Sequence, residues 1–227
     1  MNILAIDTST KIFSMAIIRD ERVVKYRNIK ADRILSSTIV PNIEKMLTRA
    51  DLPLKDVDCF AVGLGPGSFT SLRVGLATIK GLAFAMRKPI LGIPSLDITA
   101  QGVAHLSSDV CSVMDARRGM VFFCQYRVTN GRAQKVSPYH LAALAFCLKG
   151  LKGDILFVGD GIEPYKNVLR KIKIKKFCPR LADIKFCQPQ AKNMLPLIKA
   201  RLEKGQFDDP HKLTPLYLYP DDCQIRK

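Results

Sequence analysis

The sequence is poor in the features that mark membrane-spanning, disulfide-bonded or metal-binding proteins. No apolar run reaches the roughly 18 residues of a membrane span, and the N-terminus lacks the basic start and apolar stretch of a signal peptide. The 7 cysteines are odd in number and include no Cys-x-x-Cys pair, which disfavours a disulfide framework and a zinc site. The 3 histidines are far apart, so a histidine-based metal site is not expected. We therefore expect free, buried thiols and a cytoplasmic protein.

Signatures of catalysis and nucleotide binding are also missing. No Gly-x-Ser-x-Gly hydrolase elbow, Walker loop or Rossmann glycine fingerprint occurs. The composition, with 48% hydrophobic and 25% charged residues, is that of a globular protein and excludes wholesale disorder, collagen and a coiled coil. At about 150 residues per domain, 227 residues correspond to one large domain or two small lobes.

Positive charge is the unusual component of the composition. Lys and Arg number 36 against 20 Asp and Glu, a net charge of +16, and the surplus is concentrated in residues 101–227. A basic half suggests an anionic partner, either nucleic acid or a membrane surface. A solvated, lysine-rich surface that keeps the protein soluble is the alternative interpretation.

Hydrophobic periodicity predicts an alternation of strands and helices. In the first half, strands are expected at 2–6, 13–18, 22–29, 59–64 and 89–93, and helices at 35–47, 70–87 and 96–106. Pro41 is expected to kink or split the first helix. In the second half, strands are expected at 110–114, 121–128 and 154–158, and helices at 141–148, 164–172 and 191–203. Asn130-Gly131 is a hairpin signal.

Both halves contain an apolar strand that ends in Asp, then a hairpin, a helix and a strand. This parallel predicts an α/β fold of two related lobes. We place the boundary between an N-terminal lobe, residues 1–104, and a basic C-terminal lobe, residues 105–227.

Two segments of the first lobe could bind a phosphate. Asp7 ends a strand and could hold a metal-bound water, while the hydroxyls and N–H groups of Thr8 and Ser9 could contact phosphate oxygens. The alternative is a turn that closes the hairpin. The segment Gly65–Thr70 joins a strand to a helix, as an anion-binding loop does, although Ser68 or Thr70 could equally be a helix N-cap.

Three further patterns allow two interpretations each. Arg117 and Arg118 could clamp an anion or pair with surface acids. In the basic stretch Lys166–Lys185, lysine and isoleucine alternate over Lys171–Lys175, which is typical of a strand with one lysine face. That face could follow a phosphate backbone, or its lysines could protect a sheet edge from pairing with another edge. Ala77, Gly81 and Ala85 lie on one face of the predicted helix 70–87 and would let another helix approach, either within this chain or from a partner.

Several of these motifs occur in the same order in a known family. The opening Ile3–Ser9, the loop Gly65–Thr70 with Arg73 and Gly75, Asp115–Arg118, Gly159-Asp160-Gly161 and the tail Pro215–Leu218 together resemble the bacterial TsaB family. The resemblance implies the two-lobed fold of actin, sugar kinases and Hsp70, which is ribonuclease H-like. It also implies a non-catalytic scaffold that binds TsaD, with the ATPase TsaE as a third component. That assembly adds threonylcarbamoyl to N6 of the adenosine just 3′ of the tRNA anticodon.

The resemblance also assigns residues. The partner interface would consist of Leu35, Ile39, Ile43, Ser71, Ala77, Gly81 and Ala85. The positions where this fold type holds a nucleotide would be Asp7, Thr8, Ser9, Gly65, Gly67, Ser68, Thr70, Arg73 and Asp160. Family members usually carry Gly where Ser71 stands and His where Leu35 stands, so local contacts differ there. No metal or cofactor of its own is expected, and ATP or ADP would bind at the partner interface.

Other functions remain open at this stage. One is a small ATP-dependent phosphotransferase of the same fold, although such kinases are much longer. A protease, an old label for relatives of TsaD, lacks a nucleophile–base constellation here. A stand-alone RNA-binding module would rest on the net charge of +16. A homodimer through the exposed helices is plausible when TsaD is absent.

Overall fold

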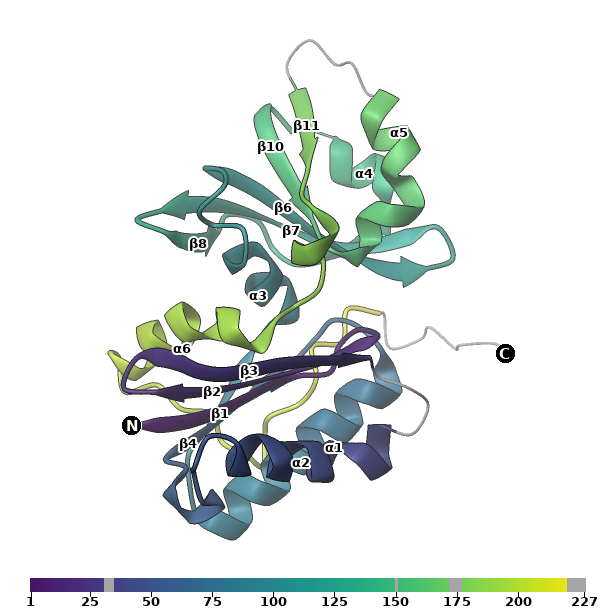
Figure 1. Cartoon of the computed structure of the whole chain (residues 1–227). Helices are drawn as coiled ribbons and strands as arrows, with labels where there is room; N and C mark the ends of the chain where they lie inside the picture. Colours follow the sequence, from purple (N-terminus) through teal and green to yellow (C-terminus); the bar gives the residue numbers. More distant parts are fainter. Residues whose placement is uncertain (31–34, 150, 172–176, 220–227) are drawn as a thin grey trace.

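The computed structural model describes residues 1–30, 35–149, 151–171 and 177–219, and consists of two lobes that are each built on one mixed β-sheet (Figure 1). The first sheet has the strand order β3-β2-β1-β4-β5, and the second has the order β11-β10-β6-β7-β8, with β9 also paired to β7. In each sheet a hairpin lies beside parallel strands, β1 beside β4 and β6 beside β10. The repeated order confirms the predicted pair of related α/β lobes.

The first sheet begins with the predicted antiparallel meander. It consists of β1 (Asn2–Asp7), β2 (Ile12–Arg19) and β3 (Arg22–Lys30), followed by the parallel strands β4 (Cys59–Gly63) and β5 (Ile90–Ile93). β4 and β5 are buried throughout, as strands covered on both faces are. Because β1 and β4 are parallel neighbours, the loops that follow them lie at the same edge of the sheet.

Two long helices cover one face of this sheet. They are α1 (Leu35–Thr48) and α2 (Phe69–Met86), with a short 3-10 turn η1 (Leu54–Asp56) after α1. Pro41 lies inside α1 without splitting it. By length and composition α2 is apolar enough to cross a membrane, a possibility that the search for unbroken apolar runs missed. It lies against the sheet instead, although only 28% of its residues are buried.

The opposite face is covered by α3 (Ser95–Gln101), η4 (Ala191–Met194) and α6 (Leu195–Leu202). Ala191, Met194 and Ile198 are fully buried in one cluster with apolar residues of β1 and β2. The expected boundary assigned this last helix to the second lobe, whereas it packs on the first sheet (Figure 1). Its apolar face predicted burial, but the identity of the covering sheet is a long-range property.

The second sheet contains the remaining strands. They are β6 (Asp109–Arg117), β7 (Met120–Thr129), β8 (Arg132–Lys135), β9 (His140–Ala143), β10 (Gly153–Val158) and β11 (Phe177–Leu181). Asn130 and Gly131 both have positive φ angles, 52° and 70°, which confirms the predicted tight turn between β7 and β8. The predicted helix 141–148 is confirmed only for residues 144–148, because residues 141–143 belong to strand β9.

Short helices surround the second sheet. They are α4 (Leu144–Leu148), η2 (Asp160–Tyr165), α5 (Lys166–Lys171) and η3 (Ile184–Phe186). The alternating segment Lys171–Lys175 falls mostly on residues 172–176, outside the described residues, so its predicted strand stays a prediction.

Several segments link the lobes, among them α3 and the C-terminal segment. Helix α3 lies between the sheets, where the Asp97 carboxylate accepts hydrogen bonds from the hydroxyls of Tyr126 and Tyr139 at 2.7 and 2.8 Å. The C-terminal segment then crosses the first lobe, where the Leu216 N–H donates to the Leu64 carbonyl. It reaches the second lobe at Tyr219, whose hydroxyl donates to the Ala116 carbonyl at 2.6 Å.

Candidate functional site

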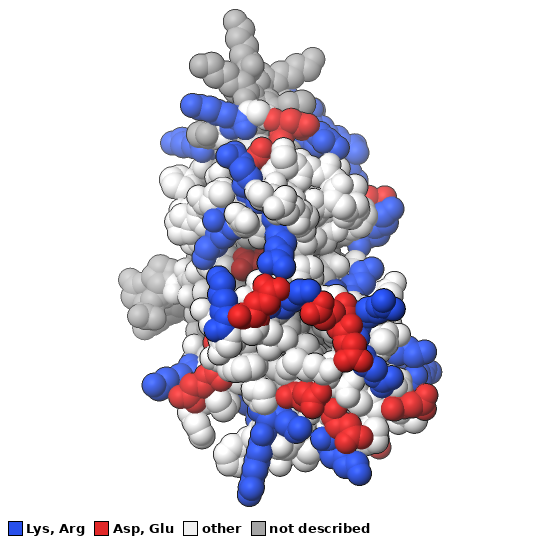
Figure 2. Space-filling model, turned by 90° about the vertical axis from the view of Figure 1, so that its left-hand side faces the viewer, with Lys and Arg blue, Asp and Glu red and all other residues white. Residues whose placement is uncertain are grey.

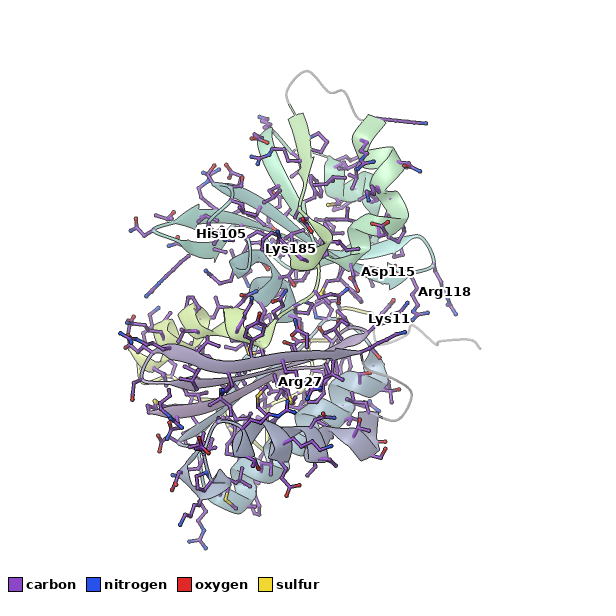
Figure 3. The ribbon with its side chains drawn as sticks, viewed as in Figure 1. Lys11, Arg27, His105, Asp115, Arg118 and Lys185 are labelled. Atoms are coloured by element: carbon purple, nitrogen blue, oxygen red, sulfur yellow. The ribbon has the colours of Figure 1, made fainter. Side chains whose placement is uncertain are left out.

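A cleft of about 800 Å³ lies between the lobes, at the ends of β1 and β6. It brings together the predicted residues Ser9, Gly67, Ser68, Thr70, Ser71, Arg117 and Asp160. Thr10 also lines the cleft, as do Lys11, Phe122 and Tyr219, which sequence reasoning did not single out as site residues. Figure 3 places Lys11 of the first lobe at the mouth of the cleft, opposite Asp115 and Arg118 of the second.

Asp7 lies next to the cleft but does not line the cleft. Its side chain is fully buried, and Oδ1 accepts hydrogen bonds from the Ser9 N–H at 2.8 Å and the Ser9 hydroxyl at 2.6 Å. Oδ2 accepts from the Ser95 hydroxyl at 2.6 Å. Burial raises the pKa of the Asp7 carboxyl above its ordinary value, although these hydrogen bonds act against the shift. Asp7 therefore forms the turn that the structural alternative predicted, and its bond to Ser95 also ties that turn to α3.

The hydroxyl of Thr8 also makes a hydrogen bond within the first lobe. It donates to the Ser71 carbonyl at 2.9 Å, and the residue is fully buried. Helix α2 approaches so closely that a Cβ on Gly75 would lie 2.2 Å from Thr8 Oγ1. Gly75 thus permits the close packing of α2 on the turn after β1, and Thr8 is a packing residue.

The loop Gly65–Thr70 packs its backbone against the same turn. A Cβ on Gly67 would lie 2.1 Å from the Ser9 carbonyl oxygen, and the Ser68 N–H donates to that oxygen at 2.7 Å. Gly65 lies deeper, with its N–H bonded to the Ser95 hydroxyl, and does not line the cleft. Ser68 occupies the N-cap position of α2, but its hydroxyl bonds that of Ser71 and does not cap the helix.

Arg73 is directed away from the cleft, contrary to its predicted place in a phosphate site. Its guanidinium lies 3.8 Å from the centre of the Phe69 ring, and its Nε donates to the Tyr217 hydroxyl at 2.9 Å. Arg73 and Tyr217 line a separate surface hollow, together with Lys80 and Leu213. Arg73 therefore links α2 to the C-terminal segment, through a contact between residues that are 144 positions apart in the sequence.

The second lobe contributes the charged wall of the cleft. Asp160 accepts a hydrogen bond from the Asp115 N–H at 3.2 Å, and burial raises the pKa of its carboxyl to about 6. Arg117 and Arg118 have positive φ angles of 62° and 51° in the β6–β7 turn, and both are exposed. Of the two, Arg117 lines the cleft. Within the described part of the chain, no group of three His, Cys, Asp or Glu residues could hold a metal ion.

The predicted partner face divides into exposed and buried residues. Ala77, Gly81 and Ala85 are exposed on α2, and no atom lies within 4 Å of where a Gly81 Cβ would be. Leu35, Ile39 and Ile43 of α1 are buried in the core of their own lobe, so their prediction as surface contacts is wrong. Ser71 lines the cleft instead of joining the α2 stripe.

Comparison with known proteins identifies the family. The model of the tRNA N6-adenosine threonylcarbamoyltransferase family, TsaD, matches residues 29–222. The tRNA threonylcarbamoyladenosine biosynthesis protein TsaB of Haemophilus influenzae is 38% identical over 230 aligned positions, which cover 96% of this chain and 93% of that protein. The chain belongs to the TsaB family. The Bacillus subtilis TsaB is 30% identical, with 76% of each chain covered.

Solved structures agree with the fold of this TsaB-family chain. YeaZ from Pseudomonas aeruginosa superposes with a TM-score of 0.83 at 24% identity, covering 96% of this chain and 99% of that one. The activator of 2-hydroxyisocaproyl-CoA dehydratase from Clostridium difficile, which carries bound ADPNP, has a TM-score of 0.50 at 10% identity. These likenesses establish the two-lobed α/β fold and nothing of the chemistry.

Proposed function

We propose that this chain is a non-catalytic scaffold subunit that binds TsaD. It takes part in the biosynthesis of threonylcarbamoyladenosine in tRNA, as its TsaB-family membership implies. TsaE joins the pair as a third component, the assembly acts on tRNA in the cytoplasm, and transfer of the threonylcarbamoyl group takes place on TsaD.

The exposed face of α2 is the observation that carries this proposal. The helix is apolar enough to cross a membrane, yet only 28% of its residues are buried. Ala77, Gly81 and Ala85 form a stripe of small side chains along that exposed face. Such a stripe lets a second helix approach closely and bury apolar surface. In the absence of TsaD, the same face would support a homodimer.

The state of the cleft supports a scaffold rather than a phosphotransferase. Asp7 has both carboxylate oxygens occupied by Ser9 and Ser95, and Arg73 is bound to Phe69 and Tyr217. Two residues expected at a phosphate are thus committed to other contacts. We propose that the chain holds no cofactor of its own and that ATP or ADP binds only where the partner completes a site.

Mixing the chain with TsaD from the same genome tests the proposal. Size-exclusion chromatography with light scattering is expected to give a stable one-to-one complex. Gly81→Leu and Ala77→Leu should abolish it, because a leucine on the small stripe holds the partner helix away. Ala145→Leu, on an exposed position of α4, is the matched control and should leave the complex intact.

Two results would contradict this function. Normal complex formation by both stripe variants, with circular dichroism showing an intact fold, would refute the interface. Separate peaks for the wild-type proteins, together with ATP turnover by the isolated chain, would favour the phosphotransferase instead.

A further inference from the structure

The outer edge of the first sheet carries cations that have no ion-pair partner among the described residues. β3 is an edge strand, and its 9 residues include 4 Lys or Arg and no Asp or Glu. Lys25, Arg27 and Lys30 are exposed, and no ion pair with a carboxylate involves them within the described ranges. Figure 3 shows Arg27 below the β3 ribbon, on the side of the sheet where α1 and α2 lie.

Several other cations of the molecule do have an acidic partner. Lys199 pairs with Glu21, Arg201 with Asp208, and Arg127 with Asp109. On the side of the molecule shown in Figure 2, acidic side chains lie among the basic ones over the first lobe. As far as the structure describes the chain, the middle of β3 is one of the places where part of the net charge of +16 has no ion-pair partner.

A fourth cation reaches the same edge from a distant segment. Lys192 of η4 places its Nζ 4.5 Å from the centre of the Tyr26 ring, and Tyr26 is 54% exposed. Lys25 and Arg27 pair with Ile17 and Met15 of β2, whose side chains belong to the α1–α2 core, so the two cations lie on that face of the sheet. Lys192 lies on the opposite face, and the edge is basic on both sides.

Acidic residues set the limit of this surface at the cleft. Burial raises the pKa of Asp160, and the positive charge of Lys11 is close enough to act against that rise. Asp115 lies opposite Lys11 in Figure 3. At the other end of β3, Glu21 pairs with Lys199. The surface that remains consists of Lys25, Arg27, Lys30 and Lys192, here named the β3 basic edge.

We infer that the β3 basic edge binds the sugar–phosphate backbone of RNA, which is tRNA in the complex of the proposed function, on which this inference rests. Cations that neutralise phosphates release counterions and contribute affinity without reading sequence. Lysines on an edge strand also prevent edge-to-edge pairing, but Lys192 comes from another element and is not needed for that. Membrane binding favours a broad face with large apolar side chains, which a single strand edge does not provide.

The test measures tRNA binding by the complex of this chain with TsaD between about 50 and 250 mM salt. The variant is K25Q/R27Q/K30Q, and the matched control is K149Q/K152Q/R170Q on exposed positions of the second lobe. Loss of three phosphate contacts should weaken binding roughly ten- to hundredfold near 0.15 M salt and reduce the salt slope by about 3. The control should stay within about twofold of the wild type.

Three outcomes would overturn the inference. One is an unchanged salt slope for the β3 variant, and another is an equal loss in the control, which would mean a diffuse charge effect. The third is loss of binding to phosphatidylserine vesicles without loss of tRNA binding. Failure of the proposed function is detected separately, since wild-type chain and TsaD would not co-elute. In that case the same variants are compared on tRNA with the isolated chain over the same salt range, where the same difference in slope is expected.

Discussion

The turns after β1 and β6 use the same backbone device in two different environments. Asp7 Oδ1 accepts the N–H of Ser9, and Asp115 Oδ1 accepts the N–H of Arg117, each two residues ahead and each at 2.8 Å. Asp7 is fully buried, whereas Asp115 is exposed at the cleft. β1 ends at Asp7, whereas β6 continues past Asp115 to Arg117, and the neighbouring loops also differ.

Different loop packing explains the contrast. In the first lobe, Gly63 leaves room for Asp7, because a Cβ there would lie 1.9 Å from Asp7 Oδ2. In the second lobe the loop after β10 approaches the β6 backbone itself, and a Cβ on Gly159 would lie 1.9 Å from the Val113 carbonyl oxygen. The loop then places Asp160 against the Asp115 N–H. Asp7 is therefore part of the buried contact between the turn and α3, whereas Asp115 is part of the cleft wall.

The strongest test of this comparison replaces each aspartate by alanine. Asp7→Ala leaves the buried hydroxyls of Ser9 and Ser95 without their acceptor, and we expect a loss of about 2–4 kcal/mol in the free energy of unfolding. Asp115→Ala should cost less than about 1 kcal/mol, because the residue is exposed. Urea unfolding measures both. Asp7→Asn is the control and should be milder, since its amide oxygen can still accept from Ser9. Equal losses for the two alanine variants would refute the comparison.

A smaller effect is expected from the helix that closes the first turn. Gly75→Ala places a methyl group 2.2 Å from Thr8 Oγ1, so Thr8 must move and its hydrogen bond to Ser71 is disturbed. We expect a loss of about 1–3 kcal/mol, as for other overpacked sites. Gly81→Ala on the same helix meets open space and should stabilise by up to about 1 kcal/mol, because alanine favours the helix. Thermal unfolding of the pair separates close packing from helix propensity. Stabilisation by both changes would show that the turn tolerates a displaced α2.

Much of the fold was predictable because apolar periodicity is a local signal. The meander, α1 and α2 follow from it, and the Asn130-Gly131 turn signal, which is equally local, predicts the β7–β8 hairpin. The periodicity also identified Leu35, Ile39 and Ile43 as one face of a helix. It could not distinguish a face covered by the protein's own sheet from one left for a partner, because both require apolar residues at the same spacing.

The candidate site was predictable only in part, for a related reason. The loops after β1, β4 and β10 do meet, and Asp7 does form the turn that the structural alternative described. Arg73 lies outside the cleft because its side chain bonds Tyr217, which is 144 residues away, and no local pattern in the sequence indicates that contact. Lys11 and Tyr219 line the cleft through tertiary placement, and only the family resemblance drew attention to the tail.

The smallest expected effect concerns the titration of the cleft wall. Burial raises the pKa of Asp160 to about 6, above the ordinary value of 3.8. Between about pH 4 and 6 the folded protein therefore keeps a proton that the unfolded chain has lost. The stability contributed by protonated Asp160 is complete at low pH and disappears as the pH rises through about 6. Asp160→Asn has no such proton, so its melting temperature relative to the wild type should rise between pH 4 and 7. A difference that stays flat or falls would mean that Asp160 is as well solvated as an ordinary surface carboxylate, and that the cleft wall does not differ electrostatically from open surface.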